Sequence, residues 1–241
     1  MNTVLHIYFL VMTFFCLYTA VNVRTLWKQI VFHSLFIGCA IVLFTHKLDL
    51  IKNLKIFDAV KFSFDSHPYT MYLNYDKPFV GLFIFIILGF GPGKLSHIKI
   101  IKNVFRKLIP CAVILCGTGY LFNYIKFDPK IPVGYEKWML NNLFLVCVAE
   151  EAFFRRYIQR GLEQLFSFYI WGNSLSLAIA SIAFGLAHFS GGSHYVILST
   201  IAGLFYGLAY QKNLRLEAAI FVHFLVNCIH FFFFSYPFLE L

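Results

Sequence analysis

Charged residues are scarce in this sequence. They make up 13% of its 241 residues, whereas hydrophobic residues make up 60% and aromatic residues 20%. The mean hydropathy is accordingly high, at +0.73. Soluble globular domains carry about 25% charged residues, so this composition excludes that class of protein and predicts a polytopic membrane protein.

Cysteine lacks the spacings that bind metals or mark a disulfide framework. No Cys-x-x-Cys occurs, and none of the six cysteines lies in a polar segment. They are Cys16, Cys39, Cys111, Cys116, Cys147 and Cys228. Because all of them fall within apolar runs, we interpret them as small buried hydrophobic residues.

Most of the basic residues lie in the connections between apolar runs. Lys and Arg number 20 against 11 Asp and Glu, which gives a formal net charge of +9. None precedes the first apolar run, and Arg24 and Lys28 follow it, which favours a first transmembrane helix over a cleaved signal peptide. Such residues act as topology signals and contact anionic head groups. We therefore predict a multi-pass protein of the cell membrane, with the bacterial inner membrane favoured, the lipid bilayer as a partner and no nucleic acid.

Eight apolar runs can be marked, without an internal repeat or a long linker between them. They cover residues 4–23, 30–45, 78–91, 108–124, 138–159, 173–188, 195–210 and 216–234. Residues 47–77 instead alternate lysines with apolar residues, as in a segment at the membrane interface or a solvated loop. Gly203 and Gly207 have a spacing that allows close helix packing within the chain. We predict one membrane-embedded domain over residues 1–241, an all-α bundle of about eight transmembrane helices.

Two adjacent carboxylates, Glu150 and Glu151, interrupt the run 138–159. An ionised side chain at the centre of a bilayer costs at least about 2.5 to 3.5 kcal/mol, so it persists when it is paired, protonated or open to a polar cavity. Arg155 follows Glu151 by four residues, which is the favourable order for an ion pair on one helix face. Glu150 points about 100° away from Glu151. We predict that Glu151 is the structural partner of Arg155 and that Glu150 is free for chemistry.

Two later runs carry polar residues at the same spacing of four. Phe184 and His188 lie in the run 173–188, and His223 and Asn227 lie in the run 216–234. A single histidine in a membrane helix is more often a hydrogen-bonding group between helices than a catalyst. Several polar groups together are costly there unless they satisfy one another or act chemically. We therefore expect these residues to converge with Glu150 inside the bundle.

The expected cluster has the groups needed to hydrolyse an amide. Glu150 in an apolar cavity would gain proton affinity and act as a general base, and His188 could shuttle the proton. The N–H groups of His223 and Asn227 could hold an oxyanion. Because neither Ser nor Cys is placed in these motifs as a nucleophile, direct attack by water is favoured. The same Glu, His and His groups could alternatively bind a divalent metal such as zinc, with an open position for water.

Three motifs follow one another on late apolar runs: Glu-Glu-x-x-x-Arg, Phe-x-x-x-His and His-x-x-x-Asn. Together they resemble the CPBP family, which comprises the type II CAAX prenyl endopeptidases with the bacterial bacteriocin-processing and Abi proteins. The resemblance covers residues 138–234 and leaves the helices of residues 1–125 without an assigned role. It implies a glutamic-type intramembrane peptidase, in which Glu150 and His188 activate water and His223 and Asn227 stabilise the oxyanion. Members have also been described as metalloproteases, but no cofactor is favoured here.

The resemblance implies a peptide or protein substrate in or at the membrane, of the prenylated or leader type. Glu151, Arg155 and Phe184 would support the site structurally. The alternative is an immunity or scaffold protein that keeps the family fold without catalysis. A proton-coupled transporter would show broken helices in two related halves, which the sequence lacks. We favour the intramembrane endopeptidase.

Overall fold

The computed structural model describes residues 2–45, 53–73, 75–91, 97–212 and 214–240. Within these residues the chain forms eight helical segments and one β-hairpin. The helices are α1 (Asn2–Asn22), α2 (Leu26–Thr45), α3 (Asp76–Leu88), α4 (His97–Leu121), a long helix over residues 135–165, α8 (Gly172–Leu186), α9 (Gly192–Gln211) and α10 (Leu216–Phe233), with a short 3₁₀ turn, η3 (Phe189–Gly191), before α9. The prediction of an all-α membrane bundle with about eight helices is confirmed.

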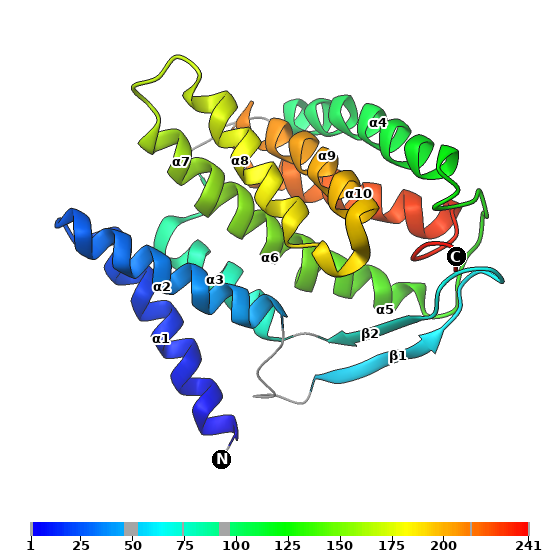
Figure 1. The fold of residues 1–241 in the computed structure, drawn as a ribbon, viewed down its shortest axis with the longest axis horizontal. Helices are drawn as coiled ribbons and strands as arrows, with labels where there is room; N and C mark the ends of the chain where they lie inside the picture. The colour runs from blue at the N-terminus through cyan, green and yellow to red at the C-terminus, as the bar shows by residue number, and fades with distance from the viewer. Residues whose placement is uncertain (1, 46–52, 74, 92–96, 213, 241) are drawn as a thin grey trace.

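The helix of residues 135–165, which we call the central helix, runs through the middle of the molecule (Figure 1). It consists of α5 (Tyr135–Leu140), η1 (Asn141–Cys147), α6 (Val148–Glu151), η2 (Ala152–Gln159) and α7 (Arg160–Leu165). α3 packs on one side of it, and α8 and α10 pack on the other. α1 and α2 pair with each other beside α3, whereas α4 lies against α9 and α10. The central helix therefore separates α1, α2 and α3 from α4, α8, α9 and α10.

Four helices of the described chain are long and apolar enough to cross a membrane. They cover Thr3–Asn22, Leu26–Thr45, Phe189–Gln211 and Leu216–Phe233, while α8 is apolar but shorter. α1 and α2 leave large apolar side chains such as Leu5, Tyr8, Trp27 and Ile30 exposed. An uncovered apolar surface of this size is stable against lipid and unfavourable in water. These features are those of a membrane protein.

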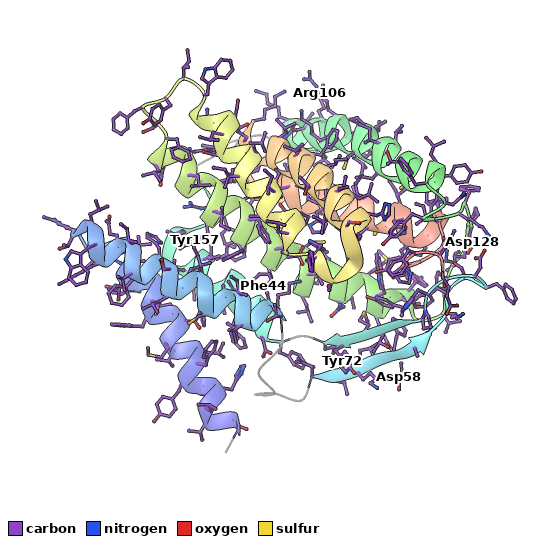
Figure 2. The ribbon with its side chains drawn as sticks, viewed as in Figure 1. Phe44, Asp58, Tyr72, Arg106, Asp128 and Tyr157 are labelled. Atoms are coloured by element: carbon purple, nitrogen blue, oxygen red, sulfur yellow. The ribbon has the colours of Figure 1, made fainter. Side chains whose placement is uncertain are left out.

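α4 is longer than its apolar run predicted. It begins at His97, so residues 99–107, which we expected to form a connection, are helical. Ile100, Val104 and Leu108 are buried at helical spacing, whereas Arg106 is exposed (Figure 2). The apolar periodicity of this segment is therefore what makes it part of the helix, despite its charge.

The segment of residues 47–77 contains a β-hairpin, which the sequence analysis missed. β1 (Leu54–Val60) pairs antiparallel with β2 (Tyr69–Leu73), with Leu54 opposite Leu73 and Val60 opposite Tyr69. Residues 47–52 and 74 lie outside the described residues. Asp58 and Tyr72 mark the outer part of the hairpin (Figure 2). Its apolar side chains, which include Phe57, Tyr69 and Met71, pack on Trp138, Phe231 and Tyr236. This contact closes one end of the bundle and brings Tyr69 to the cavity described below.

α8 and α9 approach each other closely at small residues. A Cβ atom placed on Gly203 would lie 3.1 Å from the Cα atom of Ser181, and one placed on Gly207 would collide with Leu177. Both neighbours belong to α8 of the same chain. The expectation of packing within the chain at these glycines is therefore confirmed.

Gly203→Leu should force α8 and α9 apart. Overpacking of this kind costs about 1 to 3 kcal/mol in free energy of unfolding. Gly117→Leu on α4 is the matched control, because a Cβ atom there has no neighbour within 4 Å. Both substitutions gain helix propensity by about the same amount, close to 1 kcal/mol. Thermal unfolding in detergent should therefore show a lower midpoint for Gly203→Leu alone, and equal midpoints would contradict the packing described above.

Candidate active site

The central helix places both motif carboxylates in the interior. Glu150 and Glu151 lie in α6, a short α-helical stretch between the π-helical stretches η1 and η2. π-Helical turns are rare, and they occur frequently at functional sites. The two residues are only 5% and 0% exposed. A charge in such surroundings is tolerated only when it is paired, so the partners of each carboxylate decide what it can do.

Glu151 joins two helices through its two oxygens. Its Oε2 accepts a hydrogen bond from Nε of Arg155 at 2.9 Å, and its Oε1 lies 2.8 Å from Nδ1 of His223 on α10. Arg155 is fully buried, and its guanidinium lies 5.4 Å from the ring centre of Phe184 on α8. The ion pair expected from the spacing of four is therefore present, and it extends to a histidine that the spacing did not reveal as its partner.

Glu150 is not free of partners, contrary to the expectation from sequence. Nζ of Lys77, near the start of α3, forms a hydrogen bond and an ion pair with its Oε1. Its Oε2 is buried, accepts no hydrogen bond, and lies 4.0 Å from Nε2 of His223. One oxygen of the carboxylate is thus paired with an ammonium, and the other is available.

His188 lies just beyond the end of α8, where the backbone of Phe184 holds its ring. The Nδ1 atom is 2.8 Å from the carbonyl oxygen of Phe184. Because a carbonyl oxygen only accepts hydrogen bonds, Nδ1 must carry the hydrogen, and Nε2 of the neutral ring carries a lone pair. The rings of Phe184 and Tyr195 flank the imidazole, at centre distances of 4.7 Å and 5.4 Å.

His223 is enclosed by aromatic rings. Tyr206 stacks on it at a centre distance of 4.5 Å and an interplanar angle of 15°, and Phe184 meets it edge-on at 5.7 Å. Its Nδ1 is occupied by Glu151. Because a carboxylate only accepts hydrogen bonds, Nδ1 carries a hydrogen and donates it to Glu151.

Asn227, one turn after His223 on α10, is oriented by the central helix. Its Nδ2 donates a hydrogen bond to Oδ1 of Asn142 at 3.2 Å, and Sγ of Cys147 donates to the same oxygen at 3.4 Å. Nδ2 of Asn227 also makes a long contact of 3.9 Å with Sγ of Cys147. An amide nitrogen carries two hydrogens, and a thiol sulfur is a weak acceptor, so one N–H of Asn227 is only weakly engaged.

One cavity of about 350 Å³ collects these side chains. Glu150, His188, His223 and Asn227 all line it, although they come from three different parts of the chain. The other walls are mostly aromatic and apolar, and include Tyr69, Leu115, Tyr124, Phe184, Tyr195, Val226 and Phe238. The volume lies in the range of small-molecule and peptide side-chain sites, about 300 to 1,000 Å³. The convergence expected from the sequence is therefore present, with Glu151 behind the cavity wall.

The arrangement bears on the metal-site alternative. Among the described residues, no three His, Cys, Asp or Glu side chains are grouped so that they could hold a metal ion. Around Glu150 the cationic role is taken by Lys77. The geometry of the described residues gives a Glu, His, His metal site no support.

Three residues of this site were missed from the sequence: Lys77, Asn142 and Tyr206. Lys77 precedes Glu150 by 73 positions and looked like one of several interfacial lysines. Asn142 belongs to a pair of asparagines at the start of an apolar run, which was a usable sign of a buried polar contact. Tyr206 lies between Gly203 and Gly207, in a segment whose sequence pattern indicates helix packing and gives no sign of a contact with a histidine.

Residues 133–229 match the model of the Rce1-like family, whose full description is "type II CAAX prenyl endopeptidase Rce1-like". The matched segment extends from the start of the central helix almost to the end of α10 and contains all three motifs. No curated protein and no solved structure matches the chain. The family match confirms the resemblance to the type II CAAX prenyl endopeptidases, and at the level of the family it indicates a membrane protease.

Glu151→Gln should destabilise the protein more than Glu150→Gln. The first substitution leaves the fully buried Arg155 and the ring of His223 without their carboxylate, and breaking a buried ion pair costs about 3 to 5 kcal/mol. Glu150→Gln removes the partner of Lys77 only, whose side chain is 13% exposed. Protein yield and unfolding temperature in detergent provide the comparison, and equal values for the two variants would refute this division of roles.

Proposed function

We propose that this protein is an intramembrane endopeptidase, which hydrolyses a peptide bond of a membrane-associated substrate by direct attack of water. The observation that carries the proposal is the convergence of Glu150, His188, His223 and Asn227 on one largely apolar cavity. The family match over residues 133–229 supports the same reaction class. We place the enzyme in the cell membrane, and its assignment to a bacterial inner membrane stays a prediction.

In this proposal Glu150 and His188 activate the water. Oε2 of Glu150 is buried without a hydrogen-bond donor, and Nε2 of His188 carries a lone pair because Nδ1 is bonded to a carbonyl. A water molecule has two hydrogens, so it can donate one to each of these acceptors. The proton that the water loses on attack passes to this pair, which then delivers it to the leaving amine.

His223 and Asn227 stabilise the oxyanion in the same scheme. Nδ1 of His223 faces the Glu151 carboxylate, so Nε2 can donate only when the ring is an imidazolium. The second N–H of the Asn227 amide supplies the other donor, because the first is bonded to Asn142 and the second makes only the long contact with Sγ of Cys147, which the oxyanion would replace. Two preorganised donors in a site of low dielectric constant stabilise developing charge far more than water does.

The substrate class follows from the cavity walls. Tyr69, Tyr195 and Phe238 offer broad apolar surface next to the catalytic groups. Such walls suit a peptide with large apolar or lipid-modified residues near the cleaved bond. Prenylated peptides and apolar leader peptides are the two candidate substrate types.

Glu150→Ala should abolish cleavage while the protein still folds. Loss of a general base lowers the rate about 10²- to 10⁴-fold. The assay uses purified protein in detergent and a library of membrane-anchored and prenylated peptides, with product detected by mass spectrometry. Cleavage that persists in a chelator but disappears in Glu150→Ala is the expected result.

Three outcomes would change the assignment. Loss of cleavage in the chelator would point to a metal site. Cleavage retained by Glu150→Ala would refute the assigned base. A folded wild type without activity, together with a cellular phenotype that Glu150→Ala leaves intact, would favour the immunity or scaffold role.

A further inference from the structure

The ammonium group of Lys77 is a charged group of the site that comes from the N-terminal helices. It comes from α3, outside the segment that matches the family. Its ammonium is hydrogen-bonded to Oε1 of Glu150, and the two side chains are 13% and 6% exposed. The ring of Phe44, near the end of α2, lies 5.2 Å from Nζ and is marked in Figure 2. An aromatic face is a favourable neighbour for a partly desolvated ammonium. Lys77 is therefore held on the Glu150 carboxylate from more than one side.

The packing of α3 on the central helix keeps Lys77 in this position. Gly81 lies one turn after Lys77, and a Cβ atom placed on it would be 3.1 Å from the Cα atom of Ala149. Ala149 immediately precedes Glu150. At the preceding residue, Asp76 lies 3.5 Å from Nε2 of His6 on α1, and both side chains are buried. The start of α3 is thus fixed against α6 on one side and α1 on the other.

The charged and titratable groups around Glu150 come from every element packed on it. α3 supplies Lys77, the central helix supplies Cys147, Glu151 and Arg155, the end of α8 supplies His188, α9 supplies Tyr195 and Tyr206, and α10 supplies His223. Glu151 already shares its charge between Arg155 and His223. Lys77 is the residue in this set whose full positive charge is directed at Glu150 itself.

We propose that Lys77 is a positioning residue of the active site: its ammonium keeps the buried Glu150 carboxylate ionised, and it occupies Oε1 so that Oε2 is the oxygen that holds the water. The assignment deepens the proposed function and rests on it for its catalytic meaning. Without a cation, a carboxylate at this depth binds a proton and loses its function as a base. With Lys77 on one oxygen, the base is charged before substrate arrives, and only one oxygen can accept from the water.

Chemical labelling tests the charge state of Glu150 without any substrate. A hydrophobic carbodiimide adds to protonated carboxyl groups, because the carboxyl O–H adds across a C=N bond and the adduct rearranges to a stable N-acylurea. Lys77→Met should label Glu150 at least about tenfold faster than wild type at neutral pH, since an opposite charge at this distance shifts protonation by about 1 to 3 pH units. Labelling is read by peptide mass spectrometry, with Glu163 of the same helix, paired to Arg160, as internal reference.

Two controls separate charge from general disruption. Lys77→Arg keeps the cation and should label Glu150 at the wild-type rate. Lys102→Met removes an exposed lysine of α4 and should also change nothing. If Lys77→Met does not fold, Lys77→Gln replaces it with the same expectation. Equal labelling of Glu150 in wild type and in the neutral variant would overturn the proposal, and so would fast labelling in Lys77→Arg.

The pH profile of cleavage supplies the catalytic test. Lys77→Met should move the acid limb of kcat/KM to higher pH by about 1 to 3 units, because Glu150 must then lose its proton without help from a cation. A packing role alone would lower the rate equally at every pH and would overturn the assignment. Faster cleavage by Lys77→Met at neutral pH would also overturn the assignment, because Lys77 would then inhibit the base in the wild-type protein. If the labelling rates are those expected above but no peptide is cleaved, the Lys77–Glu150 pairing is retained and the proposed function is refuted instead.

Discussion

A single fully buried carboxylate ties the polar interior of this protein together. Glu151 accepts a hydrogen bond from Arg155 on its own helix and contacts His223 on α10. Three charged or chargeable groups share a space that water does not reach, so each is stable only while the others stay in place. The register between the central helix and α10 is set by this contact, and with it the positions of His223 and Asn227 at the cavity. The apolar packing around them holds the helices together, and the contacts of Glu151 fix the orientation of the two helices relative to each other.

The same constraint explains why buried charged residues are confined to so few positions. Among the described residues, all of the buried Asp, Glu and Arg side chains except Asp76 lie on the central helix. Its π-helical stretches flank the two glutamates and alter the direction of the side chains on either side. Asn142 and Cys147 in η1 then reach Asn227 on α10. Local irregularity of the helix thus serves the placement of partners from different helices.

Local patterns were enough to predict much of this arrangement. The apolar runs located the helices because helix length and hydropathy are local properties, and the spacing of four found the pair of Glu151 and Arg155 because that contact lies within one helix. The hairpin was missed because lysines alternating with apolar residues are compatible with a strand, an interfacial helix or a loop. Lys77 was missed for a different reason. Its contact with Glu150 depends on how α3 is placed against α6, and no spacing along the chain contains that information.

The family match begins at residue 133, but the charged groups at the cavity include one that comes before it. Lys77 lies in the N-terminal part of the chain, and its ammonium is among the groups that offset the two glutamates. Proteins that share all three motifs and differ in their first helices would therefore have the same cavity groups at a different net charge. In evolutionary terms, replacing Lys77 would change the charge beside Glu150 by one elementary charge, and with it the reactivity of the site, while every motif residue stays unchanged.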